Sequence, residues 1–184
     1  MGKTLKKTGI NRKNVVSSVH HISGLWAAGG KTMEKARGNL TEVYIIRLEP
    51  GSDVLEEIEE ACRQYDIKNG VILSGLGGWS RASYFDPTRF PDGRVGYGTA
   101  IVKEGLLSLV SISGLICHEE DGTVSPHIHV TLSYGDGTTI GGHLGYGSKV
   151  LTTTEVVIGR VEQIDMVRRV DPVIGLPLFH PIQL

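Results

Sequence analysis

One short turn, Gly135-Asp136-Gly137, constrains the fold of this chain more than any other feature. Gly-Asp-Gly is a favourable three-residue connection between antiparallel strands, because its last glycine can take a left-handed backbone conformation. A hairpin centred on the aspartate pairs His129 directly with His143, with Cβ atoms about 5 Å apart. A register that differs by one residue would pair His143 with Ile128 or Val130, on the opposite face. The turn therefore predicts a hairpin that brings two histidines together on one face of a sheet.

A third histidine joins this pair. His127 lies two residues before His129 in the same strand, so both side chains project from one face, about 6.5–7 Å apart at Cα. Three imidazoles this close disfavour protonation of one another, whereas a divalent metal binds the neutral rings. Three histidines with a fourth position open are the ligand pattern of a reactive zinc site. The sequence predicts a zinc site at His127, His129 and His143, and imidazole also suits nickel, copper, cobalt or iron.

Two other interpretations of the histidines stay open at this point. They could be ordinary polar strand residues with local partners, or His129 and His143 could simply stack on each other. Three glycines lie close to His143 in the sequence, namely Gly141, Gly142 and Gly145. Because glycine has no side chain, they predict space for a small-molecule ligand to approach the metal.

Two charged residues are candidates for an assisting catalytic role. Glu155 begins a predicted strand soon after the hairpin. It could be a general base, a metal ligand or a hydrogen-bond partner of a ligand histidine; the alternative is an exposed carboxylate at a strand end. Arg81 closely follows Gly77-Gly78-Trp79 and could bind an anionic ligand; the alternative is a salt bridge at the rim of the sheet.

The clearest helix spans about residues 53–65. Asp53 can cap its N-terminus, and apolar residues follow at helical spacing with charged residues on the other face. The apolar positions are Val54, Leu55, Ile58, Ala61, Cys62 and Tyr65. The remaining pattern predicts strands at residues 43–48, 71–73, 81–85, 98–102, 106–116, 127–133, 138–144 and 155 to about 170. The expected fold class is α/β (α+β), a mostly antiparallel mixed β-sheet with one principal amphipathic helix packed on it.

The length and the charge distribution suggest one folded domain with a basic arm. A chain of 184 residues can bury one substantial core. Residues 1–33 carry no acidic residue and have a charge of +6, whereas the remainder has a charge of −7. We therefore expect a basic N-terminal arm at residues 1–40 and a metal-binding domain at residues 41–184. Such an arm can contact DNA, a protein partner or the acidic body of a neighbouring subunit, or it can be a solvated tail.

Cysteine content and hydropathy indicate the cellular compartment of the protein. Cys62 and Cys117 form neither a disulfide framework nor a metal-ligand spacing, and Cys62 falls on the apolar face of the predicted helix. No run of about 18 apolar residues could cross a membrane, and the N-terminus lacks the apolar stretch of a secretory signal. The sequence favours a cytoplasmic protein with no membrane partner.

Several short segments, in their order and spacing, are typical of one known family. They are Val71-Ile-Leu-Ser-Gly-Leu-Gly77, Gly105-Leu-Leu-Ser-Leu109, Ser113-Gly114, Pro126-His-Ile-His-Val-Thr-Leu-Ser133, Gly141-Gly-His-Leu144, Glu155-Val-Val-Ile158 and Gly175-Leu176. On these segments the chain resembles the plant-and-prokaryote-conserved (PPC) domain family, prokaryotic type, over about residues 43–176. The resemblance implies a sheet-plus-helix fold, a homotrimer and metal-binding histidines, which fall here on His127, His129 and His143.

The resemblance also implies two functions. Plant members combine the domain with an AT-hook and act in DNA binding and transcription, and this chain has no Arg-Gly-Arg-Pro core of an AT-hook. The first hypothesis is accordingly a metal-binding trimeric module for DNA binding, transcriptional regulation or assembly. The fold is also similar to that of acetolactate decarboxylase, a zinc enzyme with three histidines on a sheet. The alternative hypothesis is a zinc-dependent lyase or hydrolase for a small polar substrate, with Glu155 or Arg81 assisting.

Overall fold

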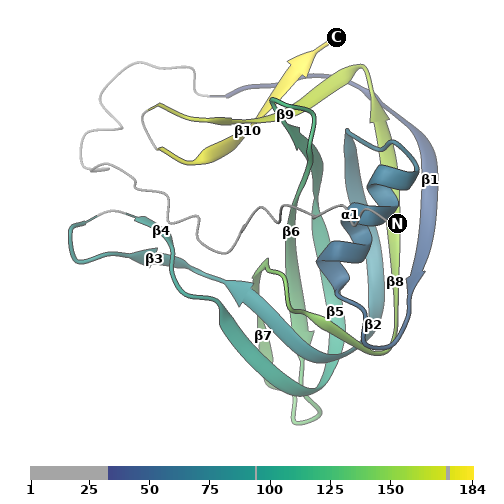
Figure 1. Cartoon of the computed structure of the whole chain (residues 1–184), viewed down its shortest axis with the longest axis vertical. Coiled ribbons are helices and arrows are strands. Elements are labelled where there is room, and N and C mark those ends of the chain that lie inside the picture. Colours follow the sequence, from purple (N-terminus) through teal and green to yellow (C-terminus); the bar gives the residue numbers. More distant parts are fainter. Residues whose placement is uncertain (1–32, 94, 173–174) are drawn as a thin grey trace, which may run out of the picture.

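The computed structural model describes residues 33–93, 95–172 and 175–184, so most of the predicted basic arm lies outside the described residues. The elements occur in an order that places the principal helix after the first strand (Figure 1). They are β1 (Asn39–Leu48), α1 (Val54–Gln64), β2 (Gly70–Phe85), β3 (Pro87–Arg89), β4 (Val95–Tyr97), β5 (Ile101–Glu119), β6 (Val124–Ser133), β7 (Thr139–Leu144), β8 (Lys149–Glu162), β9 (Ile164–Val170) and β10 (Pro177–Gln183).

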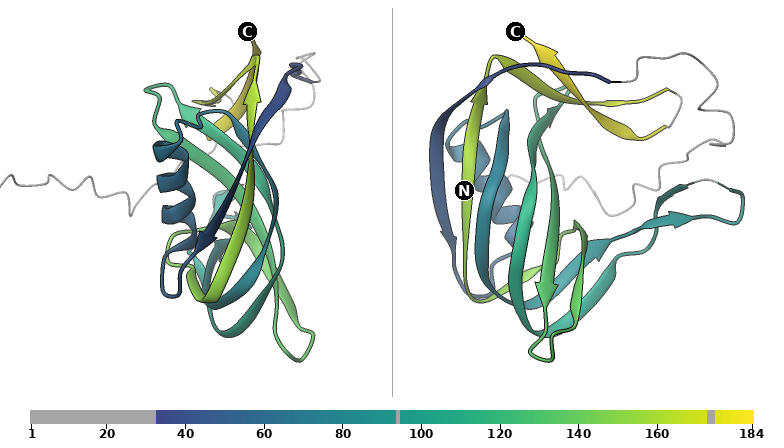
Figure 2. Two further views of the ribbon diagram at one scale, coloured as in Figure 1. Left: turned by 90° about the vertical axis from the view of Figure 1, so that its right-hand side faces the viewer. Right: turned by 180° about the vertical axis from the view of Figure 1, so that it is seen from behind.

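Most strands belong to one strongly curved sheet, ordered β1-β8-β2-β7-β6-β5-β9-β10. β2 also pairs with β5, so β2, β7, β6 and β5 close into a ring. Most neighbouring strands are antiparallel, and β5 and β9 are parallel where His118 pairs with Val167. β3 and β4 form a separate two-stranded ribbon that projects from the body (Figure 2). The structure thus confirms a mixed, mostly antiparallel sheet with one helix, and that helix is short.

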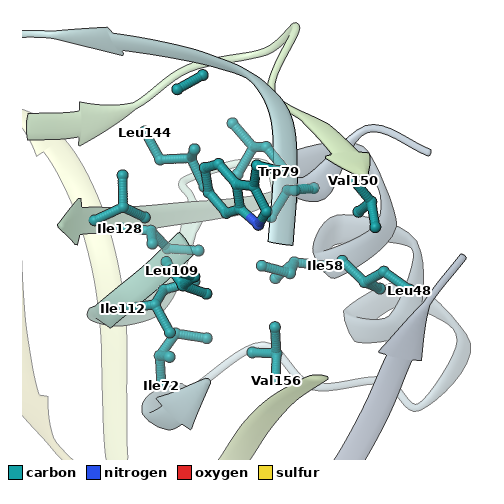
Figure 3. Close-up of a cluster of buried hydrophobic side chains, with 14 of the residues drawn as sticks. Leu48, Ile58, Ile72, Trp79, Leu109, Ile112, Ile128, Leu144, Val150 and Val156 are labelled. Carbon is teal, nitrogen blue, oxygen red and sulfur yellow. The ribbon is translucent and has the colours of Figure 1, made fainter. Parts of the chain in front are cut away.

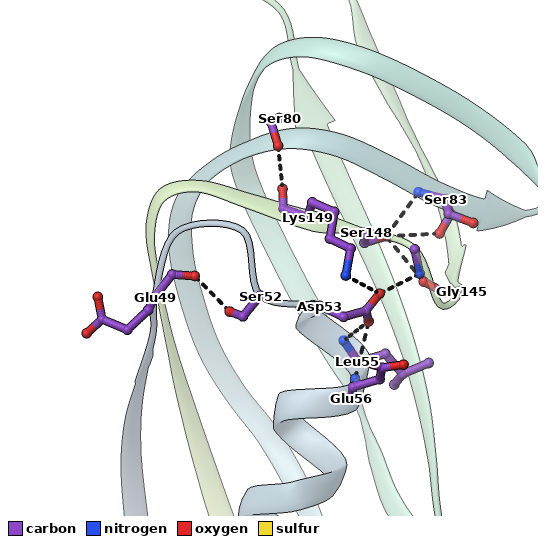
Figure 4. Close-up of polar contacts among 11 residues, drawn as sticks. Glu49, Ser52, Asp53, Leu55, Glu56, Ser80, Ser83, Gly145, Ser148 and Lys149 are labelled. Carbon is purple, nitrogen blue, oxygen red and sulfur yellow. Dashed lines mark hydrogen bonds and ion pairs between the residues drawn. The ribbon is translucent and has the colours of Figure 1, made fainter.

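Asp53 fixes the start of α1 and connects the helix to the sheet. Its Oδ1 accepts hydrogen bonds from the backbone N–H groups of Leu55 (3.1 Å) and Glu56 (3.3 Å), which confirms the predicted cap. Its Oδ2 accepts the N–H of Gly147 (2.6 Å) and lies 3.5 Å from Nζ of Lys149 (Figure 4). Because Asp53 is only 4% exposed, one buried carboxylate holds the helix against the connection between β7 and β8.

Replacing Asp53 with alanine should lower the free energy of unfolding by about 2 kcal/mol, because the helix loses its cap and Gly147 loses its acceptor. Urea unfolding followed by circular dichroism measures the change. Asp53→Asn keeps an oxygen at the cap and should lose less. A loss below about 0.5 kcal/mol in Asp53→Ala would show that the carboxylate does not anchor the helix.

The core lies between α1 and the concave face of the sheet. Trp79 is fully buried, and its Nε1 donates a hydrogen bond to Oγ1 of Thr154 at 3.0 Å. Ile128 and Val130 of β6 are 2% and 4% exposed and belong to this core. Around Trp79, Figure 3 shows Leu48, Ile58, Ile72, Leu109, Ile112, Ile128, Leu144, Val150 and Val156. Since side chains alternate along a strand, the histidines of β6 lie on the other face.

β2 is longer than the sequence pattern predicts. Residues 71–73 and 81–85, expected as two strands, belong to one strand whose register against β8 shifts three times. The glycines between them allow close packing of the sheet. A Cβ on Gly75 would lie 2.6 Å from Cγ2 of Ile112 and 2.8 Å from the carbonyl oxygen of Glu155. Glycine here permits a continuous strand instead of ending one.

Other strand limits also differ from the expectation. The predicted strand at residues 155–170 divides into β8 and β9, because Gln163 has a φ of +68°, a left-handed conformation that breaks a strand. Residues 98–100 of the predicted strand 98–102 lie outside any strand, between β4 and β5. The strands β3, β4 and β10 were not predicted.

No helix among the described residues is long and apolar enough to cross a membrane, since α1 has 11 residues.

Candidate metal centre

The hairpin that carries the histidines forms in the predicted register. His129 pairs directly with His143 across β6 and β7. The turn is closed by hydrogen bonds between the backbone groups of Tyr134 and Thr138 (2.9 Å) and by Oδ1 of Asp136, which accepts the N–H of Thr138 at 2.8 Å. The last glycine of the turn has a φ of +85°, as the three-residue connection requires.

The three imidazoles gather into one group, as the register predicts. Their ring centroids lie 5.3 Å apart for His127 and His129, 4.8 Å for His127 and His143, and 5.4 Å for His129 and His143. The rings are tilted by 37°, 58° and 89° to one another, so His129 and His143 do not stack. Each ring offers one nitrogen, and these nitrogens lie within 4.8 Å of one another.

The spacing of the nitrogens fits a tetrahedral metal ion. With metal–nitrogen bonds of about 2.0–2.1 Å, two ligand nitrogens in a tetrahedron lie about 3.3 Å apart. Nε2 of His127 and Nε2 of His129 lie 3.2 Å apart. In addition, Nδ1 of His143 is buried and has no hydrogen-bond partner among the described residues. A buried, unpaired ring nitrogen beside two others is what a site for a divalent cation provides.

The surroundings keep two of these rings neutral. Burial, followed by the charges of His127, His129 and Arg168, lowers the pKa of His143 from 6.5 to about 4. Burial also lowers the pKa of His127, followed by the charges of Arg168 and His129. Neutral imidazole is the form that binds metal, so these rings are in the ligand form at neutral pH.

These pKa values predict that the metal-free protein is destabilised by acid. Between about pH 6.5 and pH 4 the unfolded chain binds a proton at residue 143 that the folded chain does not bind, so the free energy of unfolding falls as the pH falls. Urea unfolding at pH 7, 6 and 5 should show this loss, and His143→Gln should show a smaller one. Equal pH dependence in the two proteins would contradict a neutral, buried His143.

The glycines near His143 have a different role from the one expected. A Cβ on Gly141 would lie 2.1 Å from the carbonyl oxygen of Val130, and one on Gly145 would lie 2.7 Å from the ring of Phe85. The space that these glycines provide is therefore filled by protein atoms. They allow β7 to pack closely against β6 and β2, and this packing sets the position of the histidine rings.

The two assisting candidates lie on other strands. Glu155 is on β8, where its carboxylate accepts a hydrogen bond from Oγ1 of Thr153 at 2.7 Å. Arg81 is on β2, 3.9 Å from the carboxylate of Glu104, as in the salt-bridge interpretation. Neither belongs to the metal-ligand group of three histidines that forms among the described residues. An assisting role for either residue stays a prediction.

Tyr97 and Arg168 lie beside the histidines, and the sequence analysis did not identify them. The ring of Tyr97, from β4, lies 4.9 Å from the ring of His143. Arg168, from β9, donates a hydrogen bond to Oγ of Ser125 at 3.1 Å, two residues before His127. No local pattern links residue 168 to this region; the parallel pairing of β9 with β5 brings it there.

His118 and the two cysteines lie outside the three-histidine group. Nε2 of His118 lies 2.6 Å from Oδ1 of Asp165, between β5 and β9. Cys62 and Cys117 are free and buried, and burial raises the pKa of their thiols to about 12 and about 11. A thiol that stays protonated in the core is inert, which confirms the expected core position of Cys62.

Comparison with known sequences identifies the family. The Plants and Prokaryotes Conserved (PCC) domain matches residues 35–162. Bifunctional protein GlmU of Synechococcus sp. (strain JA-3-3Ab) is 32% identical over 154 residues, which are 84% of this chain and 22% of that protein. AT-hook motif nuclear-localized protein 14 of Arabidopsis thaliana is 28% identical over 158 residues, which are 86% of this chain and 33% of that protein. The chain therefore spans about a fifth to a third of the length of these curated relatives.

Solved structures share the fold. A plant- and prokaryote-conserved (PPC) protein of Pyrococcus horikoshii has a TM-score of 0.68 at 22% identity, covering 83% of this chain and all of that one. The metal-containing protein AF0104 of Archaeoglobus fulgidus has a TM-score of 0.66 at 26% identity, covering 80% and 99%. A protein of Ralstonia eutropha whose name proposes DNA binding has a TM-score of 0.63 at 24% identity, covering 77% and 94%. Because the domain matches residues 35–162, which are more than half of the chain, the chain belongs to the Plants and Prokaryotes Conserved (PCC) domain family.

Proposed function

We propose that this protein is a metal-binding PCC-domain module that works as a homotrimer in DNA binding, transcriptional regulation or assembly. The observation that carries the proposal is the group of His127, His129 and His143, whose spacing and neutral rings suit a divalent cation. Zinc is the first choice because it favours tetrahedral sites with imidazole ligands. The name of the Archaeoglobus fulgidus protein, which calls it metal-containing, supports metal binding in this fold.

An exposed apolar face supports self-association. Its residues belong to β1, β2 and β5, and along β1 and β5 they alternate with residues that pack in the core, which places them on the side of the sheet away from α1. Its members are Val43, Ile45, Leu73, Leu76, Leu106 and Val110, which are 46–75% exposed. Large apolar patches on a folded chain mark interaction surfaces. A homotrimer that covers this face should sediment at three times the chain mass of 19.9 kDa, and a pair of charged substitutions at Ile45 and Leu76 should yield monomers.

The basic arm is the part of the chain that we propose contacts DNA. Residues 1–33 of the arm contain six basic residues and no acidic one, and the name of the Ralstonia eutropha relative proposes DNA binding for that protein. Fluorescence anisotropy with duplex DNA should show affinity that falls by up to about a thousandfold between 50 and 200 mM salt, because each phosphate contact releases counterions. Deleting residues 1–32 should abolish the binding.

Two controls separate this proposal from nonspecific adhesion. Replacing Lys3, Lys6 and Lys7 with glutamine should weaken binding and reduce its dependence on salt in proportion to the lost contacts. Replacing Lys35, which lies after the acid-free residues 1–33 and beside Glu34, and Lys103 should leave it unchanged. No binding at 50 mM salt, or equal binding without residues 1–32, would remove DNA recognition by the arm and leave a protein-assembly role.

A further inference from the structure

A large cavity opens beside the three histidines. Its volume is about 890 Å³, which is in the range of sites that hold small organic molecules. It is bounded by α1, by β9, by the start of β6 and the end of β7, and by the β3–β4 ribbon with the residues that follow it. The lining residues that matter here are Phe85, Phe90, Tyr97, Glu119, His143 and Arg168.

Arg168 brings a positive charge to this cavity, and no carboxylate among the described residues forms an ion pair with it. Its guanidinium donates hydrogen bonds to two neutral oxygens, Oγ of Ser125 (3.1 Å) and the carbonyl oxygen of Pro177 (3.2 Å). Its Nε is buried with no hydrogen-bond partner in the described part of the chain. The neighbouring Arg169, by contrast, forms an ion pair: its Nε lies 3.2 Å from the carboxylate of Glu120. A guanidinium whose hydrogen-bond partners are neutral keeps its positive charge uncompensated, and its remaining N–H groups can donate to an anion.

The same charge lies close to the histidines. Arg168 and His143 both line the cavity, so the positive field of the guanidinium extends toward the metal-ligand group. A bound divalent metal would add to this field. The wall that contains Arg168 and His143 is therefore the electropositive end of the cavity, and a carboxylate is the common biological group that binds a guanidinium through two parallel hydrogen bonds.

We propose that this cavity binds a small monocarboxylate with an apolar or aromatic body, the carboxylate lying at Arg168 beside the three-histidine centre. The rings of Phe85, Phe90 and Tyr97 line the cavity and suit the apolar body. Glu119, which pairs with Arg168 across β5 and β9, also lines the cavity and would repel a second negative charge, so the ligand has one carboxylate. The inference rests on the proposed metal centre only for the additional positive charge of the metal, because the guanidinium of Arg168 is present with or without a metal.

Cobalt-loaded protein tests the proposal with spectroscopy. Visible absorption of tetrahedral cobalt changes when a ligand binds at or beside the metal, so benzoate should alter the spectrum, whereas benzyl alcohol, which is neutral, should not. Arg168→Gln should weaken benzoate binding at least about tenfold, because a charge-assisted hydrogen bond is lost. Arg169→Gln, the same change at the neighbouring position, should bind benzoate as the wild type does. Phthalate, with two carboxylates, should bind less tightly than benzoate.

Ligand-observed NMR on the metal-free protein separates this inference from the metal proposal. If cobalt does not bind but benzoate binds in an Arg168-dependent way, the metal proposal fails and the carboxylate site stands. If cobalt binds but benzoate shows no binding, or binds equally to wild type and Arg168→Gln, the carboxylate site is wrong. Should Arg168→Gln not fold, Arg168→Lys keeps the charge without the paired donors, and benzoate affinity equal to that of the wild type would overturn the proposal.

Discussion

Replacing His129 with alanine lowers the affinity for zinc at least about a hundredfold, because the variant keeps two of three ligands. His129 is the right position for this test since it is exposed, so its removal opens no cavity in the core. Nε2 of His127 then loses the nitrogen 3.2 Å away that completes the tetrahedral edge. Competition with a chromophoric chelator measures the affinity of the purified variant and of the wild type.

His180→Ala is the matched control for this prediction. His180 is on β10, where its Nδ1 pairs with Glu34 at 2.8 Å, away from the three-histidine group. We expect zinc affinity within about twofold of the wild type in this variant. Equal losses in the two variants would show that histidine content in general, and not the gathered site, binds the metal.

Replacing Trp79 with alanine lowers the free energy of unfolding by about 3–5 kcal/mol, the range for a fully buried aromatic side chain. Trp79 is 0% exposed and fills the centre of the core (Figure 3). The variant also leaves the hydroxyl of Thr154 without the indole donor that lies 3.0 Å away. Since a small domain has a total stability of only about 5–15 kcal/mol, much of the protein is expected to unfold at moderate temperature.

Urea unfolding of three proteins tests this prediction. Trp79→Phe keeps most of the buried ring and should lose clearly less than Trp79→Ala. Leu106→Ala removes an apolar side chain that is 75% exposed and should change the monomer's stability by less than about 0.5 kcal/mol. A loss below about 1 kcal/mol in Trp79→Ala would mean that Trp79 is not central to the core.

The parts of the site that the sequence predicts correctly are local. The turn at residues 135–137 fixes the register of β6 and β7, and the two-residue period of a strand then places the rings of His127, His129 and His143 together. The cap at Asp53 is also a local pattern, and it was predicted for the same reason. Such features depend on residues within one hairpin or one helical turn.

The parts that could not be predicted depend on contacts between distant segments. β2 was expected as two strands. The glycines in its middle pack against Ile112 and the backbone of Glu155, and a residue without a side chain gives no sign of such packing in the sequence. Arg168 reaches the cavity only because β9 pairs with β5 in parallel, and Tyr97 reaches His143 from the ribbon. Hydrophobic periodicity contains no information on such pairings.

The closed ring of strands explains why an exposed metal site can be rigid. His127 and His129 alternate with Ile128 and Val130, which are fixed in the core. His143 pairs with His129 on one side and with Phe85 on the other. Ligands held by backbone pairing on two sides lose little freedom when a metal binds, which favours affinity.

The most direct test of the central claim is the metal content and ligand shell of the full-length protein. Elemental analysis after zinc loading and dialysis, followed by X-ray absorption at the zinc edge, gives both quantities on one sample. We expect one zinc per chain with imidazole nitrogens at about 2.0–2.1 Å, and a loss of both in His129→Ala. Zinc far below one per chain, or a shell without imidazole, would contradict a metal centre at His127, His129 and His143.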